Sequence, residues 1–218
     1  MSIRRFMLRA SSFLPLFSPW EKSQWITSDD TVRNGTSQSF LDIVDPGAPE
    51  NPFPLSIAKF HGHLDYDTLG GSGFASQRTI NDWPGLDLSD YDHIVIEIPY
   101  TDGKKYTINL KDTVLPPTES GAEQATISWG FDFQLPATET KQRKGAIDRV
   151  VINFADLVPT FRGRVQNDTA PLDLANIKRV SIMIRSFFAK QNGNFELRIK
   201  SINAKSSAPS LLKMRSIL

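Results

Sequence analysis

The 218-residue chain contains no cysteine. It therefore has no disulfide, no thiolate ligand for zinc and no cysteine nucleophile. Histidine is also scarce, because only His61, His63 and His93 occur, and none stands in a recognisable Ser-His-Asp context. No carboxylate pair is singled out by spacing, although 24 acidic residues are present. We predict that the chain is not an enzyme.

Long apolar runs and an excess of one charge are missing too. No run approaches the roughly 20 apolar residues that cross a bilayer, so we predict no transmembrane span and leave peripheral membrane association open. The 25 basic residues nearly balance the 24 acidic ones, which gives a net charge of +1. Such a chain has no overall field that attracts nucleic acid, and we predict no nucleic-acid partner.

The first twenty residues contain no acid and carry Arg4, Arg5 and Arg9. On a helical wheel their apolar side chains share one face, as is typical of a mitochondrial presequence. A short surface helix or a disordered tail is the alternative. We interpret residues 1–20 as a presequence or amphipathic tail, residues 21–204 as one domain, and residues 205–218 as a flexible C-terminal tail.

From residue 90 onward, apolar and polar residues alternate with a period of 2, the pattern of strands with one buried face. The clearest run is 127–135, in which Trp129 falls in register with the buried side. Asp102-Gly103, between the runs 94–98 and 105–110, predicts a hairpin. Asp173 predicts a capped short turn over 171–177. These strands predict an all-β, antiparallel β-sandwich or jelly roll in a single domain.

Alternating polar residues follow one another at His61, His63, Asp65 and Asp67. On a strand they would project from one face, where they could converge on a metal ion. The simpler interpretation is the solvent face of a strand that leads into a turn. The spacing also fails as a calcium loop, because Ser76 stands where the bidentate acid is needed. We expect no metal and no cofactor.

Three tryptophans, Trp20, Trp25 and Trp83, are not explained by the alternation. Indole rings can stack on sugars or anchor a protein partner. Packing over the edge of the sandwich is the alternative that we favour.

Seven short segments occur in order between Trp25 and Ala204. They are Ser28-Asp29-Asp30-x-Val32-Arg33-x-Gly35, Phe60-x-Gly62-x-Leu64, Gly73-Phe74-Ala75-Ser76-Gln77-Arg78, Asp87-Leu88-Ser89-x-Tyr91, Asp102-Gly103-Lys104-x-Tyr106, Asn153-Phe154-Ala155-Asp156-Leu157-Val158-Pro159-Thr160-Phe161-Arg162-Gly163, and Phe195-Glu196-Leu197-x-Ile199. In this succession the chain resembles the complex I intermediate-associated protein 30 family.

The resemblance implies a galactose-binding-like jelly roll, which agrees with the sandwich expected from the alternation. It also implies an assembly factor or chaperone for mitochondrial respiratory complex I that acts by protein–protein binding on the matrix side. Its partners would be complex I assembly intermediates or other assembly proteins. Ala146 and Ile147 stand where the family usually has a tryptophan, and the segment ahead of the domain is short. Because of these departures, we keep a cytoplasmic location as the alternative to a mitochondrial one.

We predict that Trp83, Arg78, Phe161 and Arg162 contact a partner, although Arg78 is also suited to an ion pair that holds the two sheets together. A second functional class, a carbohydrate- or small-ligand-binding module, follows from the implied fold and the spare aromatic residues.

Overall fold

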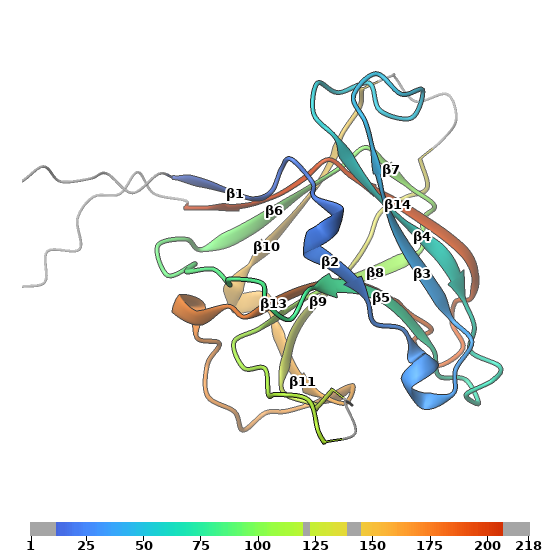
Figure 1. Cartoon of the computed structure of the whole chain (residues 1–218), viewed down its shortest axis with the longest axis vertical. Coiled ribbons are helices and arrows are strands. Elements are labelled where there is room, and N and C mark those ends of the chain that lie inside the picture. The colour runs from blue at the N-terminus through green and yellow to red at the C-terminus, as the bar shows by residue number, and fades with distance from the viewer. Residues whose placement is uncertain (1–11, 120–122, 139–144, 207–218) are drawn as a thin grey trace, which may run out of the picture.

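A computed structural model describes residues 12–119, 123–138 and 145–206. Over these residues the chain forms two packed layers of antiparallel strands (Figure 1). One layer is a seven-stranded sheet in the order β12-β11-β9-β8-β13-β5-β2. Its strands are β2 (Trp25–Thr27), β5 (Phe74–Thr79), β8 (Lys105–Lys111), β9 (Ser128–Gln134), β11 (Val158–Phe161), β12 (Arg164–Val165) and β13 (Arg179–Arg185).

The other layer consists of two four-stranded sheets, in the orders β1-β15-β6-β10 and β3-β4-β14-β7. In Figure 1 the sheet that contains β1 and β6 lies at the left, and the sheet that contains β3 and β4 lies at the right. The first contains β1 (Phe13–Phe17), β6 (His93–Ile98), β10 (Asp148–Asn153) and β15 (Ser201–Lys205). The second contains β3 (Gln38–Val44), β4 (Ile57–Leu64), β7 (Tyr100–Thr101) and β14 (Gly193–Ile199).

The described residues contain no α-helix, only the short 3-10 turns η1 (Lys22–Gln24), η2 (Asp30–Arg33), η3 (Phe154–Asp156) and η4 (Leu174–Asn176). The predicted antiparallel β-sandwich is therefore confirmed. The Asp173 carboxylate accepts a hydrogen bond from Ala175 N at the start of η4, as predicted. No helix in the described part of the chain is long and apolar enough to cross a membrane.

The core lies between the two layers and consists of the apolar side of each alternating strand. Ile108 from the seven-stranded sheet and Ile96 from the opposite layer are both buried. The Tyr106 ring lies 6.2 Å from Phe60 and 6.4 Å from Phe195 between centroids, so it bridges the layers. The period-2 pattern thus identified the inward-facing residues correctly, because burial on a strand repeats every second position.

The predicted hairpin between the runs 94–98 and 105–110 is wrong. The first run forms β6 and pairs with β10 and β15, whereas the second forms β8 in the opposite layer. Gly103 does adopt a positive φ of 87°, and the Asp102 carboxylate accepts hydrogen bonds from Lys104 N and Tyr106 Oη. The turn therefore carries the chain across the sandwich, since a turn signal fixes local conformation and not the pairing partner.

The sandwich begins before residue 21, the boundary predicted from sequence. β1 pairs with β15, and Phe17 and Trp20 are buried in the core. The Trp20 indole stacks on Phe17 at 5.5 Å and donates a hydrogen bond of 3.0 Å to Lys200 O. Residues 12–20 are thus part of the domain, and so is Lys205, which was predicted to lie in the C-terminal tail but ends β15 and pairs with β1 and β6. The predictions for residues 1–11 and 207–218 lie outside the described residues.

Two adjacent carboxylates, Asp29 and Asp30, join the edges of the two layers. Asp29 accepts hydrogen bonds from Ser39 N and Ser39 Oγ on β3 and from Ser76 N on β5. Asp30, fully buried, accepts from Ser37 N, Ser37 Oγ and Phe74 N. A Cβ at Gly35 would lie 2.2 Å from an Asp30 oxygen, so only glycine leaves the carboxylate room.

Burial raises the pKa of Asp29 above its ordinary value, because the cost of desolvating the anion exceeds the gain from its three donors. A raised folded-state pKa contributes stability below the unfolded value, and that contribution is lost as the pH rises through the folded value. We expect the unfolding free energy of the wild type, relative to Asp29→Asn, to fall from about pH 4 upward, by at most about 1.4 kcal/mol per pH unit. Urea titrations between pH 4 and 7 measure this difference, and a flat or rising one would contradict the prediction.

Candidate binding face

The seven-stranded sheet has an apolar inner face and a polar outer face. Outward-pointing residues on neighbouring strands are joined by hydrogen bonds: Thr107 Oγ1 donates to Asp132 at 2.6 Å, and Asn109 Nδ2 donates to Ser181 Oγ at 3.3 Å. Arg185 Nη2 donates to the second Asp132 oxygen at 2.6 Å. The outer face therefore presents an ordered polar surface built on a rigid sheet.

At one end of this face, three cations gather from three adjacent strands. Arg179 of β13 lies directly opposite Lys111 of β8, and Arg78 of β5 lies opposite Ser181, two residues further along β13. Because alternate residues project to the same side of a sheet, all three side chains share the outer face. We call Arg78, Lys111 and Arg179 the cationic cluster.

One carboxylate, that of Glu123, lies between the two arginines. Arg78 Nη2 is 3.2 Å from Glu123 Oε2, and Arg179 Nη1 contacts Glu123 Oε1. The two guanidinium groups also share Asn81 Oδ1, at 3.0 Å from Arg78 Nη1 and 3.1 Å from Arg179 Nη2. Lys111 Nζ donates to Thr126 Oγ1 at 3.1 Å.

The two arginines of the cluster are more buried than charged side chains usually are. The side chain of Arg179 is 5% exposed and that of Arg78 is 12% exposed, whereas that of Glu123 is 37% exposed. Burial, followed by the nearby positive charge of Arg78, lowers the pKa of Arg179. Burial also lowers the pKa of Lys111, with Glu123 opposing the effect and the two arginines adding to it. The three positive charges of the cluster thus outnumber the one negative charge, that of Glu123, that lies against them.

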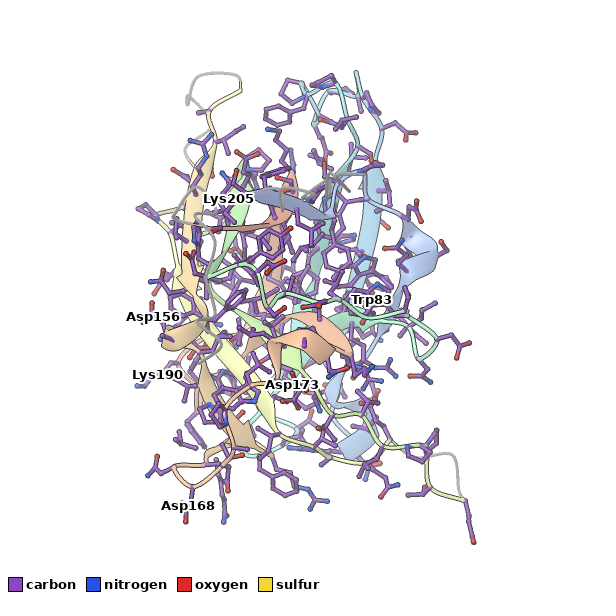
Figure 2. All side chains as sticks on the ribbon, turned by 90° about the vertical axis from the view of Figure 1, so that its left-hand side faces the viewer. Trp83, Asp156, Asp168, Asp173, Lys190 and Lys205 are labelled. Carbon is purple, nitrogen blue, oxygen red and sulfur yellow. The ribbon has the colours of Figure 1, made fainter. Side chains whose placement is uncertain are left out.

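A pocket of about 500 Å³ opens beside the cluster. Its polar wall contains Arg78, Arg179 and Glu123, and its apolar wall contains Trp83, Leu115 and Pro116. Figure 2 shows Trp83 and Asp173 on neighbouring segments, and an antiparallel bridge between Leu86 and Ile177 joins those segments. The pocket therefore combines fixed positive charge with an apolar side.

A second pocket of about 370 Å³ lies next to the first and shares Asp112 and Thr113 with it. Its lining is more apolar and includes Trp129, Phe161 and Pro171. Two adjacent hollows thus lie along the segment that follows β8.

The structure brings together two of the four residues predicted to contact a partner. Arg78 and Trp83 line the first pocket, and Phe161 lines the second. Arg162 is exposed in the turn between β11 and β12, where it has a positive φ of 50°, and its guanidinium lies 5.5 Å from the Phe161 ring centroid. The ion pair considered for Arg78 exists, but its partner is Glu123. This residue lies in the loop between β8 and β9 of the same sheet, so the pair does not join the two layers.

Sequence reasoning missed Lys111, Glu123 and Arg179. The available signal was alternation, because Arg179 and Lys111 fall on the polar side of their strands. Strand pairing, which places these two residues opposite each other, could not be read from the spacing.

The candidate metal ligands do not converge. His61 contacts Asp42 and His63 contacts Asn194, while the Asp65 carboxylate accepts hydrogen bonds from Asp67 N and Thr68 N. Within the described ranges, no three histidine or acidic side chains are grouped to hold a metal ion.

Aromatic residues are sparse on the outer face. Trp20 and Trp25 are buried in the core with Phe17, as the edge-packing interpretation predicted, and Trp83 stacks on Phe17 at 6.0 Å. Neither tryptophan nor tyrosine points outward from the described strands of the seven-stranded sheet. Two phenylalanines do lie on this side, because Phe74 of β5 is opposite Arg185 and the Arg185 guanidinium lies 4.5 Å from the Phe187 ring centroid. The described strands thus offer no outward indole or phenol ring on which a sugar chain could stack.

The sequence profile of the complex I intermediate-associated protein 30 family matches residues 16–199. The chain belongs to this family. A relative from Schizosaccharomyces pombe, described as an uncharacterised protein, is 36% identical over 185 residues, which cover 85% of this chain and 79% of the relative.

Two solved structures have the same fold as this chain, a galactose-binding-like jelly roll. A family 11 carbohydrate-binding module from Clostridium thermocellum, in complex with a β-1,3-1,4-mixed-linked tetrasaccharide, has a TM-score of 0.59 at 13% identity and covers 89% of this chain and 95% of the module. The same family of module from the cellulase Lic26A-Cel5E of that organism has a TM-score of 0.58 at 13% identity, with coverage of 92% and 96%. At this identity the similarity concerns the fold alone.

Proposed function

We propose that this member of the complex I intermediate-associated protein 30 family is a non-catalytic assembly factor for mitochondrial respiratory complex I. It acts by binding partly assembled subunits or other assembly proteins on the matrix side. The observation that carries the binding role is the cationic cluster and its pocket on the outer face. Family membership supports complex I intermediates as the partner class.

The geometry suits recognition of a protein surface. Charged groups fixed by neighbouring strands lose little conformational freedom on binding, and an apolar wall beside them provides area to bury. Arginine, which dominates the cluster, is enriched at interfaces because its planar group forms several hydrogen bonds at once.

A glycan-binding role has weaker support, because the fold alone suggests it and function resides in sites. The outer face offers few exposed aromatic rings for stacking. A glycan array with purified protein separates the two functions, since strong saccharide hits would favour the alternative.

Deleting the gene tests the proposal. We expect native gels of mitochondria from the deletion strain to show loss of mature complex I and accumulation of smaller intermediates. The wild-type gene should restore assembly, and an Arg149→Gln variant should also restore it, because Arg149 is a largely exposed residue on β10 in the other layer. Normal complex I in the deletion strain would contradict the proposal, and a cytoplasmic location of the protein would contradict its mitochondrial part.

A further inference from the structure

The cationic cluster holds more positive charge than its surroundings neutralise. Arg78, Lys111 and Arg179 face a single carboxylate, that of Glu123. The remaining charged groups that line the pocket, Asp112 and Lys178, cancel each other in number. Like charges brought together in a poorly solvated site repel one another more strongly than in water, so the site favours additional negative charge.

The cluster also has unused donors. Arg78 Nε and Arg179 Nε are buried and have no hydrogen-bond partner within the described structure. Buried polar groups are usually paired, and an unpaired buried donor destabilises the free protein. The cluster is therefore incompletely satisfied in the free protein, as is Arg185 Nε elsewhere on the same face of the sheet.

The cations and the carboxylate differ in how they are held. The three cations stand on β5, β8 and β13, which pair with one another across the middle of the sheet. Glu123 lies on the segment between β8 and β9, and it is the most exposed member of the group. The rigid part of the site is thus positive, and within the described ranges the carboxylate that contacts its arginines comes from a loop.

Glu123 shows which chemistry the site accepts. Its two oxygens each contact a different guanidinium group, an arrangement that suits a planar carboxylate. The apolar wall of Trp83, Leu115 and Pro116 lies next to this position and suits an apolar residue beside the acid.

We propose that the cationic cluster binds an acidic side chain of a partner protein, and that Glu123 occupies this carboxylate position in the free protein. The inference rests on the proposed function, because it names the part of the partner that is recognised. Glu123 is an internal competitor. A partner carboxylate displaces it and gains the two arginine contacts, while Trp83 covers the neighbouring apolar residue.

The test uses the full chain and three probes, which are a hexaglutamate peptide, a hexaglutamine peptide and inorganic phosphate, in isothermal titration calorimetry. We expect Glu123→Gln to bind hexaglutamate about tenfold or more tightly than the wild type. The substitution removes a competitor whose effective concentration is on the order of millimolar, and it adds one net positive charge to the site. Arg179→Gln in the Glu123→Gln background should reverse the gain, while Arg149→Gln in the same background should not.

Side-chain NMR supplies a second readout, since the Arg78 and Arg179 Nε–Hε signals should shift with hexaglutamate and not with hexaglutamine. If Glu123→Gln binds hexaglutamate no better than the wild type and only unfolds at lower urea, Glu123 is a structural ion pair and the inference fails. Binding of phosphate in place of hexaglutamate also overturns it, because the site would then recognise phosphate groups.

The two proposals fail independently. Loss of complex I on deletion together with no binding of hexaglutamate would overturn only the acidic-residue site. Normal complex I together with tight, Glu123-sensitive binding of hexaglutamate would overturn only the assembly function.

Discussion

Asp30→Ala is expected to lower the free energy of unfolding by about 3–5 kcal/mol. The substitution leaves Ser37 N and Phe74 N without their acceptor in a fully buried site, and Ser37 Oγ loses one of its two acceptors. An unsatisfied buried donor costs about 1–3 kcal/mol, and at least two such costs add here. Urea denaturation followed by tryptophan fluorescence measures the change.

A matched control lies nearby. Asp67 is exposed, and its removal should change stability by less than about 0.5 kcal/mol. Asp30→Asn should fall between the two variants, because its amide oxygen still accepts while its NH2 group faces a donor. Equal urea midpoints for Asp30→Ala and Asp67→Ala would show that this carboxylate does not join the layers.

Trp20→Ala is expected to destabilise the domain by a similar amount, about 3–5 kcal/mol, the range seen when a buried aromatic residue is truncated. The Trp20 ring is 4% exposed and lies 5.4 Å from Trp25 and 5.5 Å from Phe17. Its removal also leaves Lys200 O without the indole donor. Thermal and urea unfolding of the variant give the measurement.

This variant tests where the domain begins. Val32→Ala is the control, because that side chain is 78% exposed and its truncation should have little effect. If residues 12–20 were a dispensable tail, as expected from sequence, Trp20→Ala would be as stable as Val32→Ala.

The layers could be predicted from the sequence because burial on a strand has a fixed period. Ile94, Ile96 and Ile98 are therefore inward-facing in the structure as they are in the pattern. The Asp173 cap could be predicted as well, because the accepting carboxylate and the donating Ala175 N are two residues apart. Features set by neighbours along the chain are accessible to this kind of reasoning.

The N-terminal strand could not be predicted in this way. Five residues, Phe13–Phe17, are too few to separate a period of 2 from a period of 3.6, and the apolar side chains of the first twenty residues also share one face of a helical wheel. Their strand conformation comes from pairing with β15, which lies almost 190 residues further along the chain.

The candidate site was only half predictable for the same reason. Arg78 stands out because it ends one of the segments that carry the family resemblance, and Trp83 stands out because the alternation does not explain it. The pocket contains both. Arg179 and Glu123 join them only through the register of β5, β8 and β13 and through the path of the loop after β8. A single sequence does not specify that register.

The pairing of β1 with β15 has a mechanical consequence. β1 is an edge strand, Phe13 lies opposite Lys205, and Ser206 N donates to Ser12 O, so both ends of the domain meet at one point (Figure 1). A pull on the two ends would load the β1–β15 ladder in unzipping geometry, one hydrogen-bonded pair at a time, and not in shear. The domain would therefore yield to traction at its N-terminal end by peeling away β1, and with it the Phe17 and Trp20 side chains that complete the core.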